Sequence, residues 1–278
     1  MKGLYVVGTP IGNLQDMSYR AIETLKQVDF IAAEDTRVTL KLLNHFEIKK
    51  PMISYYEHTI KERGEYIISR IIRGESCAIV SDAGMPCISD PGEDLVRLCI
   101  ENGIEIKIIP GPSAVISGLC LSGFSTSRFT FEGFLSTNKS SRIDHLKSLE
   151  KEMRTMIFYE APHKLVSTLT DMKKYFGNRN IALARELTKI YEQVLHFTID
   201  DAIKYYEQTK PKGEFVLIVE GAAVPKEEEI SIDEAVSMAI KLIKDGEKAT
   251  QAAKIIAKQS GHKKSDIYSG VCSEEETL

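Results

Sequence analysis

Three loops rich in glycine and proline each follow a short apolar run, and they are the part of this sequence best suited to binding a small molecule. They occupy residues 8–12, 82–92 and 110–114. The apolar runs before them predict strands, and helical patterns follow them. Ligands of open α/β sheets bind beyond the carboxyl ends of the strands. The spacing therefore predicts a site made largely of backbone at one edge of a sheet.

The loops do not match the common nucleotide-binding signatures. The first loop, Gly8-Thr-Pro-Ile-Gly12, differs from the GxGxxG of dinucleotide sites, and the chain contains no GxxxxGK[ST] sequence. Clustered basic residues that would bind a triphosphate are also missing from these loops. The pattern favours a ligand with an adenosine-like body and no polyphosphate, such as S-adenosyl-L-methionine. For any one loop taken alone, plain turn glycines remain the alternative.

Charged side chains that follow predicted strands are candidates for proton transfer. A methyl group on sulfonium is already activated, so its transfer needs positioning and no metal, whereas a hydroxyl nucleophile benefits from a base. The candidate bases are Glu34, Asp35, Glu160, His163, Glu186 and Lys189. Structural roles compete with this interpretation: Asp35 could cap a helix, and Glu186 could pair with Lys189. The sequence leaves the base open.

Composition limits the class of protein. The chain has 278 residues, 43% hydrophobic and 27% charged, as is usual for a globular protein. A net charge of −4 excludes a generally basic protein that coats RNA by charge alone. The five cysteines form no CxxC pair, so we expect neither a disulfide framework nor a metal site. The apolar N-terminal run is too short for a signal peptide or a membrane span, and we expect a cytoplasmic protein without a membrane partner.

Alternating patterns predict an α/β protein in two blocks. Up to about residue 114, strands and helices alternate, which predicts a mostly parallel sheet. Residues 118–127 are rich in small residues and predict a linker or turn. The next block has two successive strands, which favours a mixed sheet with antiparallel pairs. Strands are expected at 4–7, 30–33, 78–81, 104–109, 129–135, 156–160, 181–186, 193–198 and 214–220, and helices at 19–27, 39–45, 60–72, 94–102, 141–152, 163–176 and 201–208.

After a predicted linker at 222–229, the tail predicts three short helices. Ser231-Ile-Asp-Glu234 is a capping-box pattern, and Gly246 and Gly261 end the first two helical patterns. Small residues at helical spacing predict a tight, helix-turn-helix-like unit. Between residues 241 and 264, seven lysines stand against two acidic residues, a local charge of +5. This concentration favours RNA binding by Lys254, Lys258, Lys263 and Lys264 over a merely solvated helix face.

The motifs taken together resemble a known family. In order they are Leu4–Leu14, Ala32-Ala-Glu-Asp-Thr-Arg37, Ser81-Asp-Ala-Gly84 with Ser89-Asp-Pro-Gly92, Pro110-Gly-Pro-Ser-Ala114, Phe131-Glu-Gly-Phe134, Phe158-Tyr-Glu-Ala-Pro-His163, Ala184-Arg-Glu-Leu-Thr-Lys189 and Gly213-Glu-Phe-Val-Leu217. Over nearly the whole chain they look like the ribosomal RNA small-subunit methyltransferase I family of the tetrapyrrole-methylase superfamily. Met85 departs from the pattern, because a threonine is usual there.

The resemblance implies two α/β domains at 1–117 and 118–224 with the cofactor cleft between them, and a helical domain at 230–278. The implied reaction is methyl transfer from S-adenosyl-L-methionine to the 2′-hydroxyl of a cytidine ribose in the decoding region of 16S rRNA. A homodimer acting on the small ribosomal subunit is the implied state. The implied cofactor contacts are Pro10, Asp82, Ala83, Gly84, Ile88, Ser113, Ala114, Glu160, Leu187, Pro211 and Gly213.

Catalytic roles among the matched positions fall to Asp35, Glu160, His163 and Lys189, without a choice of base. Arg37 and Arg185 could hold RNA phosphates. Two other readings stay open. One is an enzyme of the same fold that acts on a tetrapyrrole or another substrate, and the other is a ribosome-assembly factor that binds the cofactor without turnover. We expect removal of the residues from Glu229 onward to abolish RNA methylation and to spare cofactor binding.

Overall fold

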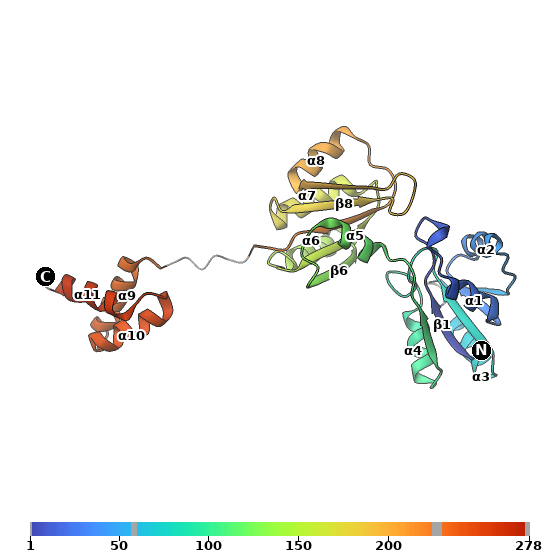
Figure 1. Cartoon of the computed structure of the whole chain (residues 1–278), viewed down its shortest axis with the longest axis horizontal. Coiled ribbons are helices and arrows are strands. Elements are labelled where there is room, and N and C mark those ends of the chain that lie inside the picture. The colour runs from blue at the N-terminus through green and yellow to red at the C-terminus, as the bar shows by residue number, and fades with distance from the viewer. Residues whose placement is uncertain (1, 57–59, 224–229, 276–278) are drawn as a thin grey trace. The chain divides into compact units, whose positions relative to one another are not determined.

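The computed structural model describes residues 2–56, 60–223 and 230–275. They form two five-stranded sheets with their covering helices, and a group of three helices near the C-terminus (Figure 1). The sheets and their helices form one compact unit, Met1–Ala222, and the remaining residues form a second, Ala223–Leu278. Within the described ranges, no helix combines the length and the apolar character that crossing a bilayer requires.

The first sheet is parallel throughout, as the alternating pattern predicted, with strand order β3-β2-β4-β1-β5. Its central strands are buried on both faces because helices cover both. The elements are β1 (Gly3–Val7), a short 3-10 helix η1 (Leu14–Asp16), α1 (Tyr19–Gln27), β2 (Phe30–Ala33), α2 (Thr36–His45), β3 (Met52–Ser54), α3 (Ile60–Ile72), β4 (Ser76–Val80), α4 (Glu93–Glu101) and β5 (Ile106–Ile109).

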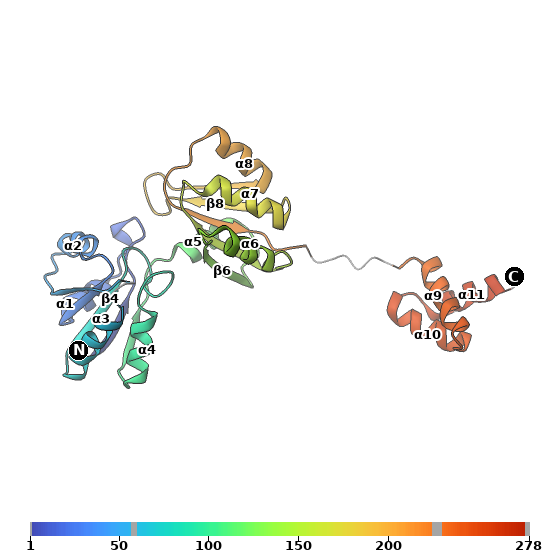
Figure 2. The same cartoon turned by 180° about the vertical axis from the view of Figure 1, so that it is seen from behind.

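The helix that follows β1 and the helix that follows β4 lie on opposite faces of this sheet. Tyr5 and Val7 pack with α1 and α2, whereas Leu4 and Val6 pack with α3 and α4 (Figures 1 and 2). Because β1 and β4 are neighbours, the two loops at their carboxyl ends lie next to each other. Such a point is where open α/β sheets bind their ligands.

The sequence missed β3, a three-residue edge strand that lacks a clear pattern of its own. It also placed the start of α2 three residues late. The side chain of Asp35 accepts a hydrogen bond from the backbone N–H of Arg37 and caps this helix, so the capping role considered for Asp35 is confirmed.

The second sheet is mixed, as expected, with strand order β6-β7-β10-β8-β9. Only β6 and β7 run parallel among its neighbouring strands. The elements are β6 (Phe129–Phe134), α6 (Lys139–Ser148), β7 (Thr155–Glu160), α7 (Leu165–Phe176), β8 (Asn180–Arg185), β9 (Gln193–Thr198), α8 (Ile199–Gln208) and β10 (Phe215–Val219). Helices α6, α7 and α8 cover one face around Leu146, Leu169 and Ile199.

The prediction of a linker at 118–127 is wrong for its first half, because α5 (Ala114–Ser122) covers the other face of the second sheet. Val115 and Leu119 pack there, and Gly118 allows close contact: a Cβ on it would lie 3.2 Å from Val216 Cγ1. The small residues of 118–127 suggested a linker, although the first five of them belong to an apolar helix. The expected domain boundary between residues 117 and 118 falls inside α5.

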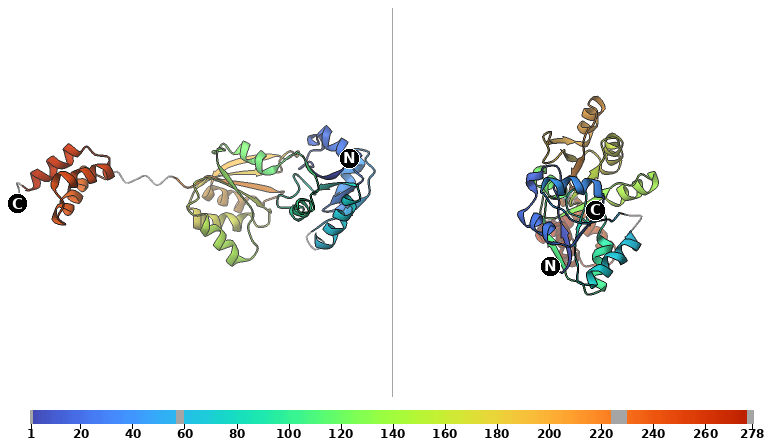
Figure 3. Two further views of the ribbon diagram at one scale, coloured as in Figure 1. Left: turned by 90° about the horizontal axis from the view of Figure 1, so that it is seen from below. Right: turned by 90° about the vertical axis from the view of Figure 1, so that its right-hand side faces the viewer.

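The three tail helices are confirmed: α9 (Ile232–Lys244), α10 (Ala249–Ser260) and α11 (Lys264–Glu275). The capping box of Ser231 and Glu234 begins α9. Small residues let the helices approach, since Ala239 and Ala252 are fully buried and a Cβ on Gly270 would lie 2.4 Å from Val236 Cγ2 (Figure 3, left). The predicted linker at 222–229 lies almost entirely outside the described residues.

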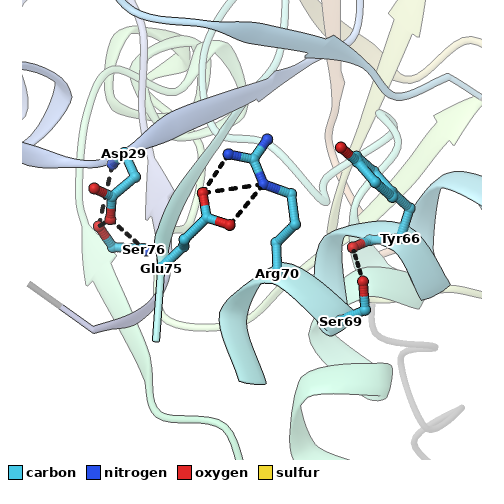
Figure 4. A network of polar contacts seen from close by, with 6 residues as sticks. All are labelled: Asp29, Tyr66, Ser69, Arg70, Glu75 and Ser76. Atoms are coloured by element: carbon cyan, nitrogen blue, oxygen red, sulfur yellow. Dashed lines mark hydrogen bonds and ion pairs between the residues drawn. The ribbon is translucent and has the colours of Figure 1, made fainter. Parts of the chain in front are cut away.

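A polar network joins the amino ends of β2 and β4, at the edge of the sheet opposite the loops that follow β1 and β4 (Figure 4). The backbone N–H and the hydroxyl of Ser76 both donate to Asp29 Oδ2, each at 2.7 Å. Arg70 lies 3.8 Å over the Phe30 ring and pairs with Glu75. The hydrogen bonds from the side chain and then the backbone of Ser76 lower the pKa of Asp29 from its ordinary 3.8.

We expect Asp29→Ala to lower the free energy of unfolding at pH 7 by about 1 kcal/mol, because the Ser76 donors lose their acceptor. Since the folded-state pKa is depressed, the stabilisation is present above pH 3.8 and lost as the pH falls through the lower folded value. Urea melts at pH 7 and pH 3 measure the difference. Asp144→Ala, at an exposed position of α6, is the control, and an equal loss there would contradict the role of Asp29.

Candidate functional site

The three glycine- and proline-rich loops meet at backbone contact beyond the first sheet. Thr9 and Gly84 form a two-way bridge, with N···O distances of 2.8 and 3.1 Å, which joins the loops after β1 and β4. A Cβ on Gly8 would lie 2.7 Å from the Cα of Gly111 and from Met85 Sδ. Only glycine fits this crossing. The convergence predicted from the sequence is therefore confirmed, and it depends on contacts between backbones.

A cavity of about 390 Å³ lies beyond these loops, between the first sheet's carboxyl edge and the second sheet. This size is usual for a small-molecule site. Its lining is Ile11, Ala83, Gly84, Met85, Ile88, Ser89, Asp90, Ser113, Ala114, Phe134, Tyr159, Glu160, Ala161, Pro162, Ala184, Leu187, Glu214, Phe215 and Val216. The charged residues of this lining are all acidic. The cavity therefore suits a neutral or cationic ligand and is a poor site for a polyphosphate.

The loop after β4 carries unusual backbone. Cys87 and Ser89 have φ angles of 70° and 64°, a region that side chains other than glycine rarely adopt. Gly92 has a φ of 138°, and a Cβ there would lie 2.6 Å from Cys87 Sγ. Such strain is concentrated at functional sites in proteins. It holds Ile88, Ser89 and Asp90 in the lining of the cavity.

Asp90 is the most perturbed carboxylate of the cavity. Burial, followed by the nearby charge of Glu34, raises its pKa to about 6, although a hydrogen bond with Ser81 opposes the shift. Tyr159, on β7, faces the same space, and burial together with the Asp90 charge raises its pKa to about 12. A cluster of shifted groups in a cavity is a mark of a functional site. Asp90 has no role among those predicted from the sequence.

Acidic residues after β2 and β4 are joined to one another. Asp82 accepts a hydrogen bond from the N–H of Asp35 at 3.1 Å and donates its own N–H to Glu34 Oε2 at 3.3 Å. Burial raises the pKa of Glu34 and of Asp82. Asp35 differs, because its hydrogen bonds with Arg37 lower its pKa to about 2. Asp35 and Arg37 neutralise each other outside the cavity lining.

Glu160 lies in the cavity lining with its carboxylate occupied. Its Oε1 accepts the N–H of Ala161 at 2.8 Å, and its Oε2 accepts the hydroxyl of Thr168 at 2.6 Å. The residue is only 4% exposed. His163 is exposed and is not part of the lining. Helix α7 begins at Leu165, two residues after the predicted start, because residues 161–164 form a turn.

The loop after β8 closes against the first loop. A Cβ on Gly12 would lie 2.4 Å from Lys189 Cγ and 2.9 Å from Thr188 Oγ1. Lys189 Nζ donates to Glu186 at 3.0 Å and to Glu214 at 2.9 Å. Burial favours a lower pKa for Lys189, but these two carboxylates outweigh it and raise the pKa. The salt bridge considered for Lys189 is thus present, and it makes the amine a poor base.

The structure brings most, but not all, of the expected cofactor contacts to the cavity. Seven of them line it: Ala83, Gly84, Ile88, Ser113, Ala114, Glu160 and Leu187. Pro10, Asp82 and Gly213 are instead next in sequence to lining residues, and Pro211 is further away in the chain. The missed lining residues include Phe134 and Tyr159. Tyr159 alternates along β7 with residues of the α6–α8 face, a period-2 signal that could have placed it.

The expected RNA-binding residues lie in different surroundings. Arg37 has an 87% exposed side chain paired with Asp35, whereas Arg185, at the end of β8, is half-buried and its Nε has no hydrogen-bond partner within the described ranges. The tail lysines are all exposed, namely Lys254, Lys258, Lys263 and Lys264. Among residues that the structure describes, none of the four pairs with a carboxylate. Their charge is therefore available to a partner.

Solved structures share this fold. The chain superposes on the methyltransferase CobJ with a TM-score of 0.61 and 18% identity, covering 80% of this chain and 95% of that one. It superposes on diphthine synthase with a TM-score of 0.60 and 14% identity, covering 80% and 90%. At such identities the likeness is one of fold.

Sequence relatives are much closer. A protein of Synechocystis sp. named ribosomal RNA small subunit methyltransferase I is 46% identical over 266 residues, 95% of each chain. A protein of Thermotoga maritima with the same name is 48% identical over 221 residues, which are 80% of this chain and 99% of that one. Because the match accounts for 99% of the Thermotoga protein and 80% of this chain, that protein is the shorter of the two.

The model of the tetrapyrrole (corrin/porphyrin) methylases matches residues 3–203, which are most of the two-sheet unit. The loops that this stretch contains are those that meet at the cavity. The chain therefore belongs to the tetrapyrrole methylase family and, within it, to the ribosomal RNA small subunit methyltransferase I family.

Proposed function

We propose that this protein transfers a methyl group from S-adenosyl-L-methionine to the 2′-hydroxyl of a cytidine ribose in the decoding region of 16S rRNA. The observation that carries the proposal is the cavity, in which converging backbone loops meet a lining whose charged residues are all acidic. The names of the relatives support small-subunit rRNA as the substrate. The choice of ribose and nucleotide is the finer part of the proposal.

The cavity fits this cofactor on charge and shape. S-Adenosyl-L-methionine has a net positive charge, because its ammonium and carboxylate cancel and its sulfonium remains. Asp90, Glu160 and Glu214 would favour that charge. Its adenosine needs apolar walls, which Leu187 and Val216 supply. The cofactor would supply an activated methyl group. The residues of the first and third loops would hold it through backbone groups, with Ser113 and Ala114 at the start of α5.

The protein's task is then to orient a ribose hydroxyl in line with the methyl carbon and the sulfur, and to exclude water. The rim of the cavity offers an RNA contact. On the loop after β8, Ile190 and Tyr191 are 95% and 72% exposed, while Leu187 of the same loop lines the cavity. Exposed aromatic rings are platforms for unstacked bases. Tyr191 would receive a base next to the target nucleotide.

The deciding experiment is methyl transfer from labelled S-adenosyl-L-methionine to small subunits that lack the modification, followed by mapping of the labelled nucleotide. Label on the ribose 2′-oxygen of one 16S cytidine supports the proposal. Label on a base would correct the reaction. No transfer to subunits or free rRNA, with cofactor binding retained, would favour a same-fold enzyme for another substrate or a non-catalytic assembly factor.

Gly8→Ala tests the cavity as the cofactor site. Its Cβ would lie 2.7 Å from the backbone of Gly111, so the first and third loops must separate. We expect the affinity for S-adenosyl-L-methionine, measured by calorimetry, to fall at least about tenfold, or about 1.4 kcal/mol. Gly74→Ala controls for general destabilisation, since Gly74 has a φ of 103° and nothing within 4 Å of its Cβ position. Unchanged affinity in Gly8→Ala would place the cofactor elsewhere.

Removal of residues 223–278 tests the tail. The shorter Thermotoga relative favours a role of the tail in affinity over a role in chemistry. We therefore replace the expectation that methylation is abolished without the tail by one of weaker RNA binding. We expect KM for small subunits to rise about tenfold or more, kcat to stay within about threefold, and the salt dependence of binding to become shallower as phosphate contacts are lost. Full kcat/KM in the truncated protein would remove the tail from RNA recognition, and a lost kcat at saturating RNA would contradict a purely binding role.

A further inference from the structure

Asp90 is a carboxylate of the cavity for which neither the motifs nor the relatives supply a role. It lines the cavity directly after the strained Ser89 and directly before Pro91. Proline fixes its own φ, and the loop is packed so closely that a Cβ on Gly92 would lie 2.6 Å from Cys87 Sγ. The carboxylate therefore occupies a position that the surrounding backbone determines. Such preorganisation is what a group acting on a reacting atom requires.

The other acidic groups near the cavity are engaged elsewhere. Both oxygens of Glu160 accept hydrogen bonds, from Ala161 and Thr168. Glu214 has an 83% exposed side chain and pairs with Lys189. Asp35, the alternative from the loop after β2, is held by Arg37 outside the lining. For Asp90, the hydroxyl of Ser81 is the one hydrogen-bonding group found to act on the carboxylate among the described residues.

We infer that Asp90 is the base that accepts the proton of the ribose hydroxyl during methyl transfer. The inference rests on the proposed function. As the bond from the ribose oxygen to the methyl carbon forms, the bond from that carbon to sulfur breaks, and its electron pair stays on sulfur. The hydroxyl proton passes to the Asp90 carboxylate. The products are the methylated ribose, S-adenosyl-L-homocysteine and a neutral Asp90, which returns its proton to water.

The electrostatic surroundings suit this role. The titratable groups that act on Asp90 or share its lining come from several elements: Glu34 after β2, Asp82 and Cys87 of the loop after β4, Tyr159 of β7, and Glu160 and Glu214 in the same lining. Burial and the like charges among them raise the pKa of Asp90 to about 6. A carboxylate of this kind is ionised at pH 7 and more basic than an ordinary aspartate, which suits a general base.

The test compares Asp90→Asn with the wild type and with Glu93→Gln, which removes an exposed charge three residues away and outside the lining. Single-turnover methylation of small subunits is measured from pH 5 to 8.5. The wild-type rate should rise with pH to a plateau, with a midpoint between about pH 5 and pH 6 when the cationic cofactor is bound. Asp90→Asn should reduce the plateau rate by about 10²–10⁴-fold and remove the rise of the rate with pH. Glu93→Gln should keep both.

Two further measurements separate a base from a binding or structural residue. Calorimetry with S-adenosyl-L-homocysteine, whose sulfur is uncharged, should give dissociation constants within about threefold for wild type and Asp90→Asn. The folded-state pKa of Asp90 is raised, so its ionisation destabilises the fold as the pH rises through that value. Asp90→Asn should therefore melt at or above the wild-type temperature at pH 7, whereas loss of a structural carboxylate would lower it.

The outcomes are distinct. A wild type that methylates no RNA would overturn the proposed function and this inference with it. An active wild type matched by Asp90→Asn would overturn the inference alone. If Asp90→Asn weakened the binding of S-adenosyl-L-homocysteine in proportion to the lost rate, Asp90 would be a ligand of the cofactor instead of a base. If Asp90→Asn does not fold, the wild-type profile decides, because a rate independent of pH between 5 and 7 excludes a base of this kind.

Discussion

Gly8 and Gly111 let the loops after β1 and β5 cross at backbone contact, and the arrangement of the site depends on that crossing. An added Cβ on either residue would lie within 3 Å of the other loop's backbone. The Thr9–Gly84 bridge then draws the loop after β4 to the same point. The cavity is consequently bounded by backbone groups whose places are set by three strands at once.

The second constraint is where α5 goes. The helix begins at Ala114, in the cavity lining, and packs its apolar residues on the second sheet. Because one helix both ends the third loop and belongs to the second core, the two sheets share the cavity. Residues of β7, β8 and β10 can therefore face residues of the first sheet's loops, and Tyr159 comes to interact with the charge of Asp90.

The site contains strained backbone and a partly buried charge, both of which lower the stability of the fold. The packing of the two hydrophobic cores must offset that loss. Cys87, Ser89, Glu186 and Thr188 all have positive φ angles, each of which costs on the order of 1–3 kcal/mol. Asp90 is ionised at neutral pH although burial opposes its charge. The strands β1, β4 and β10, buried along their whole length, supply apolar burial in compensation. Active sites commonly lower the stability of a protein in this way, and well-packed sheets compensate for the loss.

Much could be read from the sequence because the information is local. The strand-then-glycine pattern predicted the loops, and helical spacing predicted the tail helices, since backbone conformation and periodicity depend on neighbours in the chain. The motifs in order pointed to the family. The fate of each charged group could not be read, because it depends on partners distant in sequence: Glu160 is occupied by Thr168, and Lys189 by Glu214. Only the tertiary structure showed that residues 114–122 form a helix that covers the second sheet. It also showed that Asp90 lies in the cavity with a raised pKa. Both depend on burial and on charges close in space, which are properties of the folded chain.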